Sequence, residues 1–235
     1  MLHLRSGNYS SPAMHKLLTT LVLSTALAIP ALAAEDDRQT ADIKTGTTTI
    51  TFSDAVATAL DTAEVVFRKA QPARINPGKG TVTYVASGGA IDLVNAKTEI
   101  IHSGGITLAK EIVPPSIAPS AAKSEKQYKT ATILDPIIEL SETGVEPAVK
   151  KVSAIVVVNG VSKGRIHIFN IVGTVFGGAP VIVPKNKKIT ALELTLTLTS
   201  DGATELNSAL GITAFAPDAE VASAKIDVKL ASANL

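Results

Sequence analysis

The segment ALELTLTLTS, residues 191–200, has the alternation that most constrains how this chain folds. Leucine occupies every second position from Leu192 to Leu198, and glutamate and threonine occupy the positions between. Because successive side chains of a strand point to opposite faces of a sheet, the segment predicts a β-strand with one buried face. The segment KIDVKLA, residues 225–231, repeats the pattern with isoleucine, valine and leucine and predicts a second strand of the same kind.

The rest of the chain beyond residue 46 is rich in threonine, valine and isoleucine, which favour the pleated, half-buried surface of a strand. Short clusters that contain glycine predict turns at residues 76–78, 159–160 and 162–164. We expect further strands at residues 47–52, 81–86, 98–102, 106–109, 131–140, 152–158 and 164–172.

Two short segments carry helix signals instead. The segment SDAVATALDTA, residues 53–63, begins with Ser53 and Asp54 as candidate N-caps before an alanine-rich run. The segment SDGATELNSALG begins with Ser200 and ends at Gly211, a residue type that commonly stops a helix. Each helix is expected to follow directly after a threonine-rich strand.

Together these elements predict an all-β fold, a single immunoglobulin-like β-sandwich with two short α-helices that spans residues 47–235 as one domain. Residues 110–130 hold three prolines and four lysines without strand alternation and are expected to form a loop insertion. The segments ITLA and ATILDPIIEL on either side of this insertion are typical of the two partners of one hairpin. Residues 34–46 are expected to form a disordered linker.

The first 33 residues have the pattern of a secretory signal peptide. His15 and Lys16 precede the apolar run LLTTLVLSTALAI, and the small-residue triplet after it predicts cleavage before Ala34. The thirteen residues of this run span about 20 Å as a helix, less than the roughly 30 Å of a bilayer core, so the run predicts export and no transmembrane anchor. Met14 lies directly before the pattern and is an alternative start. The mature product is therefore expected to be secreted or periplasmic.

The composition excludes several functions. The chain has no cysteine, which rules out disulfides, thiolate nucleophiles and cysteine-ligated zinc. Its 22 basic and 21 acidic residues nearly balance, so no charge excess favours nucleic acid or an anionic membrane as a partner. Aromatic residues make up only 3% of the chain, too few for the stacking platforms of many sugar-binding and nucleic-acid-binding modules.

No catalytic or metal-binding constellation is recognisable by its spacing. Beyond the signal peptide only His102 and His167 could act as imidazole bases, and neither a Gly-x-Ser-x-Gly elbow nor an Asp-x-Asp-x-Asp-Gly loop is present. The segment GTVFGGAP, residues 173–180, lacks the lysine of a phosphate-binding loop, and KNKK, residues 185–188, is typical of a solvated turn. The sequence therefore predicts a protein that is not an enzyme and has no dedicated metal site.

The stretch TEIIHSGGITLA, residues 98–109, places His102 at the end of a strand and before two glycines. Gly104 and Gly105 are expected to supply the backbone freedom of a tight turn or bulge. Two interpretations of the histidine stay open. Its imidazole either hydrogen-bonds the turn or faces a pocket at the strand end and contacts a ligand there.

The order of motifs along the chain resembles the HtaA-like domain of exported bacterial proteins. The pieces that carry the resemblance are TITFSDAVATAL, TVTYVASGGAIDL, IIHSGGITL, LDPIIEL and the late LTLTLTSDGATELNSALGITAF. The resemblance spans residues 47–230, and it implies a β-sandwich with short helices that binds haem at the cell envelope.

The resemblance also implies a ligand set, in which a tyrosinate from the early helical segment binds the iron and a histidine in a glycine-flanked strand supports it. The histidine position corresponds to His102. The tyrosine position falls near Ala57–Leu60, where this chain has no tyrosine, and alanine and leucine cannot ligate iron. Tyr84 and His102 are therefore the candidate ligand contacts of this chain.

These observations predict an exported, non-enzymatic binding module that resembles HtaA-like domains, with haem or another flat apolar molecule as its ligand. Haem is implied by the resemblance alone, because the residues themselves require no cofactor. The alternative is a structural or adhesive domain that contacts other cell-envelope proteins through strand edges and loops and has no small-molecule ligand.

Overall fold

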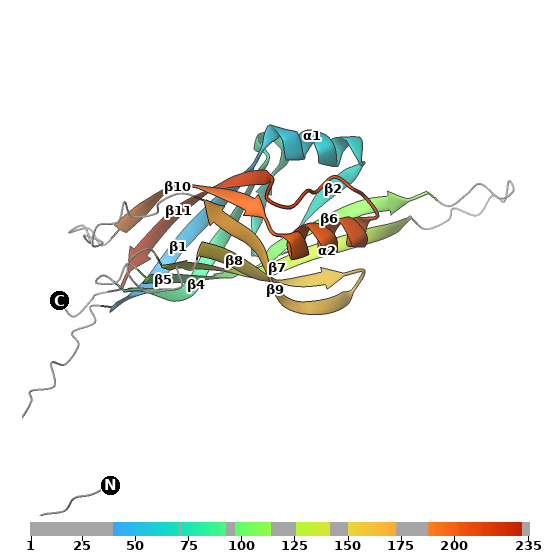
Figure 1. Cartoon of the computed structure of the whole chain (residues 1–235). Helices are drawn as coiled ribbons and strands as arrows, with labels where there is room; N and C mark the ends of the chain where they lie inside the picture. The colour runs from blue at the N-terminus through green and yellow to red at the C-terminus, as the bar shows by residue number, and fades with distance from the viewer. Residues whose placement is uncertain are drawn as a thin grey trace, which may run out of the picture. The chain divides into compact units, whose positions relative to one another are not determined.

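A computed structural model describes residues 40–70, 72–92, 97–113, 126–141, 150–172 and 188–231, all within one compact unit, Arg38–Leu235. In this part of the chain, two α-helices and one 3₁₀ helix accompany an 11-stranded sheet (Figure 1). The helices are α1 (Asp54–Thr62), η1 (Pro77–Lys79) and α2 (Ser200–Leu210). The strands are β1 (Thr40–Phe52), β2 (Val65–Ala70), β3 (Arg74–Asn76), β4 (Thr81–Asp92), β5 (Lys97–Ser103), β6 (Gly105–Ile112), β7 (Gln127–Ser141), β8 (Lys150–Val158), β9 (Val161–Val172), β10 (Lys188–Leu198) and β11 (Glu220–Leu230).

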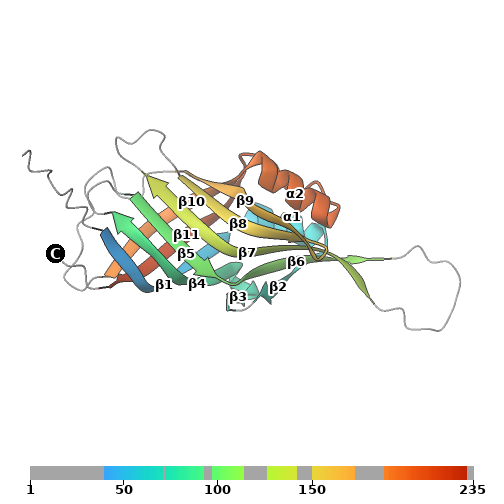
Figure 2. The same cartoon turned by 90° about the horizontal axis from the view of Figure 1, so that it is seen from below.

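The strands follow one antiparallel path in the order β2-β6-β7-β5-β4-β1-β11-β10-β9-β8, and β3 pairs with β4 beside it. A further pairing between β7 and β8 joins this path to itself, so the strands from β7 round to β8 enclose an interior (Figure 2). The predicted all-β, sandwich-like fold with two short helices is confirmed. The structure adds that the layers belong to one continuous sheet, whereas an immunoglobulin domain has two.

Strand β7 changes its pairing partner along its length. Its residues 127–134 pair with β6 and its residues 137–141 pair with β5, while β8 pairs with both parts. The ladder breaks at Asp135 and Pro136, where Asp135 has a φ of 46° and the proline has no N–H to donate. Because of this break, β6 and its neighbour β2 leave the enclosed part of the sheet and extend toward the two helices (Figure 1).

The core follows the alternation of the sequence. Leu194, Leu196 and Leu198 in β10 and Ile226 and Val228 in β11 are at most 2% exposed. The polar residues between them are exposed or only half-buried, as the sequence predicts for strands with one buried face. Since the chain has no cysteine, the burial of these apolar side chains is the main source of its stability.

Helix α2 begins at Ser200, as the sequence predicts. Its N-cap is Thr199 and not Ser200, because the Thr199 hydroxyl accepts a hydrogen bond from the Gly202 N–H at 3.0 Å. The same hydroxyl donates to the carbonyl of His167 in β9 at 2.7 Å, which ties the start of the helix to the sheet. The predicted stop is confirmed, since Gly211 ends the helix with a φ of 64°.

The start of the sheet also differs from the sequence prediction. β1 begins at Thr40, inside the segment 34–46 for which the sequence predicts a linker. The physical reason is that Ala41 and Ile43 are buried in the core, with β1 paired to both β4 and β11. Strands β2 and β3 are absent from the prediction, because each is short and β3 has no more than one apolar residue.

The predicted hairpin across the insertion is confirmed. Strands β6 and β7 pair from Gly105 and Leu134 out to Ile112 and Gln127, so both ends of the expected 110–130 loop are strand. The turn predicted at residues 159–160 is confirmed by φ angles of 49° and 83°. The signal peptide, the centre of the insertion, GTVFGGAP and residues 185–187 of KNKK lie outside the described residues.

Candidate functional site

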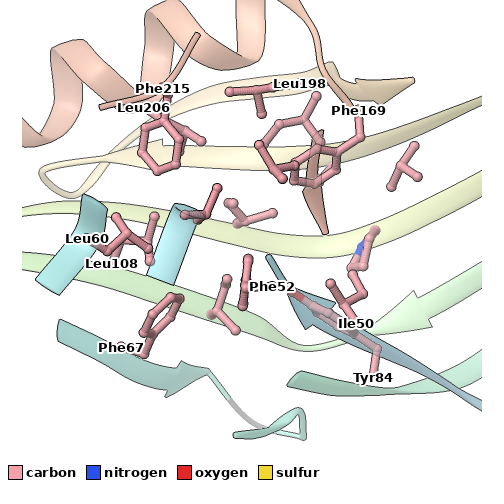
Figure 3. A pocket seen from close by; sticks show the side chains of 18 residues that line it. Ile50, Phe52, Leu60, Phe67, Tyr84, Leu108, Phe169, Leu198, Leu206 and Phe215 are labelled. Atoms are coloured by element: carbon pink, nitrogen blue, oxygen red, sulfur yellow. The ribbon is translucent and has the colours of Figure 1, made fainter. Parts of the chain in front are cut away.

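An apolar pocket lies between the two helices and the strands that extend toward them. The space inside it that a water-sized sphere can enter is about 30 Å³, because the surrounding side chains pack closely. Helix α1 contributes Val56 and Leu60, and α2 contributes Leu206. Phe67 of β2 and Phe215, from the segment between α2 and β11, complete one end of it (Figure 3). The lining is almost entirely aliphatic and aromatic, so the pocket suits an apolar ligand.

The local sequence explains why α1 faces this pocket. The Ser53 hydroxyl accepts a hydrogen bond from the Val56 N–H at 3.3 Å, which fixes the start of the helix as predicted. Val56 and Leu60 lie four residues apart and therefore on the same face of the helix, which is its buried face. Phe52, at the end of β1, contacts Phe67 with ring centroids 5.1 Å apart.

A side-chain clamp positions Phe215. The Asn207 Nδ2 group donates a hydrogen bond to the Phe215 carbonyl at 2.7 Å, and the Phe215 N–H donates to Asn207 Oδ1 at 3.1 Å. These two bonds hold the segment after α2 against the helix. As a result the Phe215 ring, 9% exposed, forms part of the pocket wall.

Tyr84 of β4 is the polar side chain that stands out in the pocket wall. It is 3% exposed, and Figure 3 shows it beside Ile50 among the residues that line the pocket. Burial raises the pKa of Tyr84 well above its usual value, so the phenol is neutral at physiological pH. Its hydroxyl forms no hydrogen bond with another described residue, and it is not among the fully buried polar atoms that lack a partner, a group in which the described residues include only Thr98 Oγ1. The hydroxyl is thus available as a donor to a ligand.

His102 of β5 lies behind Tyr84, with the two rings edge to face and their centroids 6.2 Å apart. Its Nδ1 donates to the Pro136 carbonyl at 3.0 Å, and the Thr48 hydroxyl donates to its Nε2 at 2.7 Å. This assignment follows because a carbonyl can only accept, so the proton of the neutral ring is on Nδ1. Both nitrogens are therefore engaged within the protein.

The environment of His102 favours the neutral imidazole. The side chain is 2% exposed, and this burial lowers its pKa to about 4. Backbone hydrogen bonds with Pro136 and Ile100 act in the opposite direction and are outweighed. The histidine is consequently uncharged at neutral pH and braces the break in β7.

The two glycines after His102 are explained by close backbone contacts. Gly104 has a φ of 85°, and a Cβ there would lie 2.6 Å from Pro72. Gly105 has no positive φ, but a Cβ on it would lie 2.0 Å from the carbonyl oxygen of Ile133. Glycine is the residue that fits both positions.

Asp135 is a site-forming residue that the sequence analysis missed. Its Oδ1 accepts a hydrogen bond from the Gly104 N–H at 2.8 Å, and its own N–H donates to the Gly104 carbonyl at 2.8 Å. These two hydrogen bonds join the kink between β5 and β6 at Gly104 to the break in β7. The signal was present in the motif LDP, because an aspartate before a proline commonly marks an irregular backbone.

Two further sequence expectations concern residues outside the pocket. His167 of β9 is exposed and its Nε2 lies 3.0 Å from the Phe169 carbonyl, so it takes no part in the site. Among the described residues, no group of three histidine, cysteine, aspartate or glutamate side chains could hold a metal ion. In the same part of the chain, no helix has the length and apolar character that a membrane crossing requires.

Comparison with known proteins identifies the fold. No protein-family model matches the chain, and no curated protein matches it significantly in sequence. The crystal structure of the C-terminal domain of HtaA from Corynebacterium glutamicum is similar, with a TM-score of 0.54, 11% identity, and coverage of 81% of this chain and 99% of that one. The chain has an HtaA-like fold. The N-terminal domain of HtaA gives a TM-score of 0.51, 11% identity, and coverage of 80% and 98%.

The helix in which the resemblance implies a tyrosine is α1 of this HtaA-like fold. Ala57 and Thr58 are exposed on it, and Leu60 faces the pocket. None of these side chains is an iron ligand of the kind known for haem proteins. Tyr84 approaches the same pocket from the sheet side, and the helix contributes only apolar surface to it.

Proposed function

We propose that this chain is an exported, non-enzymatic binding module whose pocket takes a flat, mainly apolar small molecule, with haem as the first candidate. The observation that carries the proposal is the neutral Tyr84 side chain in the wall of an otherwise apolar pocket, whose hydroxyl has no hydrogen-bond partner among the described residues. A ligand that accepts a hydrogen bond from this hydroxyl would supply an interaction that no described residue makes with it.

The lining of the pocket supports an apolar small-molecule ligand. The space open inside it is about 30 Å³, far smaller than a porphyrin, so binding requires α1 and α2 to move away from the sheet. Phe52, Phe67 and Phe215 offer flat aromatic surfaces, and the aliphatic side chains of both helices offer the rest. Each 100 Å² of apolar ligand surface buried there would contribute roughly 2.5 kcal/mol before the entropic cost of association.

The donor set indicates how a porphyrin would be held. Tyr84 is kept protonated by burial, and both nitrogens of His102 are already hydrogen-bonded. The helical segment Ala57–Leu60 has no ligating side chain. We therefore propose that binding depends on the apolar ring and on a hydrogen bond from Tyr84, and that the iron adds little.

The test is a titration of the mature protein with haemin and, separately, with metal-free protoporphyrin IX. A shift of the haemin Soret band and a change in porphyrin fluorescence report binding. We expect the two affinities to agree within about threefold, a difference below 1 kcal/mol. Much tighter binding of haemin would show that the iron is ligated, and would overturn this form of the proposal.

A matched pair of variants places the ligand. Phe67→Lys introduces a charge into the pocket and should weaken binding at least tenfold, because an ammonium group is costly in an apolar site. Val66→Lys is the control, since Val66 is the next residue, points to the opposite face of β2 and is 50% exposed. Equal effects of the two variants would exclude this pocket as the binding site.

The second candidate function is the structural or adhesive envelope domain. The observation that favours it is the edge strand β2, which pairs with β6 on one side and with no described strand on the other. An exposed strand edge can pair with an added strand from a partner. If neither porphyrin binds, and the mature protein instead captures an envelope protein that Val66→Pro abolishes, this function replaces the first.

A further inference from the structure

Two lysines face each other on the helix-covered side of the hairpin formed by β6 and β7. Lys110 of β6 and Lys129 of β7 are direct cross-strand partners, and they therefore share one face of the sheet. The Lys129 side chain reaches the end of α2, because a Cβ built on Gly211 would lie 2.5 Å from its Nζ atom. This contact shows that the shared face is the one that carries α2.

The pair stands just beyond the apolar pocket. Leu108 lies two residues before Lys110 on the same face of β6, and it lines the pocket. Two residues of a strand advance the chain by about 7 Å, so the lysines begin where the apolar lining ends. An amphiphilic ligand has this arrangement of an apolar body and an adjacent charged group.

The two lysines lack the acidic partner that neighbouring lysines have. Lys126 contacts Glu111 at 2.8 Å, and Lys151 contacts Glu139 at 3.2 Å. Within the described ranges, neither lysine of the pair forms an ion pair. Like charges placed directly opposite each other destabilise a sheet. An anion bound between the two ammonium groups would reduce this repulsion.

The end of α2 accounts for only one of the two charges. A lysine near the carboxyl end of a helix interacts favourably with the helix dipole, and Lys129 has this position. Lys110 is half-buried, and its cross-strand partner on the β2 side is the apolar residue Val65. This partner offers no negative charge to the ammonium group. A helix-end role therefore leaves Lys110 unexplained.

We propose that Lys110 and Lys129 together bind the carboxylate of an amphiphilic ligand whose apolar body occupies the pocket. The inference rests on the proposed function and narrows it to carboxylate-bearing amphiphiles. A long-chain fatty acid and a porphyrin with acidic side chains share this chemistry. A charge-assisted contact of an ammonium with a carboxylate is stronger than a neutral hydrogen bond, so the pair selects the acid over its ester.

The experiment compares each acid with its methyl ester on the mature protein. The probes are cis-parinaric acid and its methyl ester for the lipid source, and protoporphyrin IX and its dimethyl ester for the porphyrin source. The wild-type protein should bind at least one acid about tenfold tighter than its ester. Lys110→Gln/Lys129→Gln should remove this preference and leave the ester affinity unchanged within about twofold. Lys126→Gln, which removes a lysine already paired with Glu111, should keep the preference.

The outcomes separate the two proposals. Equal affinity for acid and ester in the wild-type protein would overturn the lysine inference and leave the pocket assignment standing. Absence of binding by every probe would overturn the proposed function and this inference with it. A lower melting temperature in the double variant with an unchanged acid preference would also overturn the inference, because the pair would then act only on stability. Preference within one pair of probes alone identifies the source of the carboxylate.

Discussion

The interior enclosed by the sheet and the pocket beneath the helices are both largely apolar. Tyr84 lines both regions, whereas His102 lines the interior and not the pocket. In the interior, His102 has partners for both ring nitrogens, Thr48 and the Pro136 carbonyl. In the pocket wall, the Tyr84 hydroxyl has no partner within the described residues. The two rings lie 6.2 Å apart, so this difference is not one of location in the fold. The comparison teaches that a buried ring whose polar atoms all have partners stabilises the fold, whereas a ring whose polar atom lacks a partner can bind a ligand.

The two regions also differ in what closes them. The hollow around His102 has a volume of about 10 Å³ and lies between hydrogen-bonded strands. The pocket is covered by α1 and α2, which contact the sheet through side chains and caps. Side-chain packing permits small displacements more readily than a strand ladder does. A ligand is therefore expected to enter beneath the helices and not through the sheet.

The largest change in stability is expected for a substitution at Gly105, where the enclosed interior meets the pocket side of the sheet. Gly105→Ala places a Cβ against the Ile133 carbonyl at 2.0 Å, a distance that requires the backbone of β6 or β7 to move. We expect a loss of about 3–4 kcal/mol in the free energy of unfolding, measured by urea denaturation.

Gly88→Ala is the matched control for this substitution. Gly88 has no atom within 4 Å of a built Cβ and no positive φ, so the change should alter stability by less than about 1 kcal/mol. Similar losses in both variants would mean that the close contact at Gly105 is not what limits this position.

The next effect is expected at His102 and depends on pH. The imidazole titrates near ~6.5 when the chain is unfolded and near 4 when it is folded, so the unfolded state binds more protons between these values. The contribution of this shift to the free energy of unfolding is complete above pH ~6.5. It is lost as the pH falls toward 4, by about 3 kcal/mol in total. Urea denaturation of the wild-type protein between pH 7 and pH 4 measures this loss.

His102→Asn isolates the histidine from the carboxylates that also titrate in this range. The variant should be less stable at pH 7, because Thr48 and the Pro136 carbonyl lose a well-placed partner. Its stability should also fall less steeply with acid than that of the wild-type protein. Parallel pH profiles for the two proteins would show that His102 is not held neutral by the fold.

The sequence predicted the strands that carry the enclosed interior well, because their alternation reports burial directly. Leu194, Leu196 and Leu198 of β10 and the apolar residues of β11 are buried as their spacing requires. Strand β2 was missed, since VVFRKA has no alternation and gains its place by pairing with β6. The same is true of the first residues of β1, which are ordered by contacts with β4 and β11.

The candidate site was less predictable than the fold. Tyr84 and His102 were selected from the sequence, but their different roles depend on which polar atoms meet across strands distant in the chain. His102 lies 54 residues from Thr48 and 34 from Pro136, and no local pattern reports such pairings. The pocket itself combines residues of α1, α2 and β2, whose meeting depends on the break in β7.

A smaller effect is expected at Asn207, which holds one wall of the pocket. Asn207→Ala removes both hydrogen bonds to the Phe215 backbone and should lower stability by about 1–2 kcal/mol, measured by thermal denaturation. Porphyrin affinity should fall as well, because the Phe215 ring is no longer fixed in the wall. The control is Ser208→Ala on the exposed side of the same helix, which should change neither quantity. Unchanged affinity in Asn207→Ala would show that the Phe215 segment does not contribute to binding.

The smallest effect on stability, and the clearest on binding, is expected at Tyr84. Tyr84→Phe removes a hydroxyl that has no partner among the described residues, so the free energy of unfolding should stay within about 0.5 kcal/mol or rise slightly. Affinity for a ligand that accepts the hydrogen bond should fall about fivefold to tenfold, as measured by porphyrin titration. Tyr128→Phe, on the residue that stacks beneath Arg68 at 4.2 Å, is the matched control and should leave binding unchanged. If Tyr84→Phe instead destabilises the fold by more than about 1 kcal/mol while affinity stays constant, Tyr84 belongs with His102 as a residue that holds the fold.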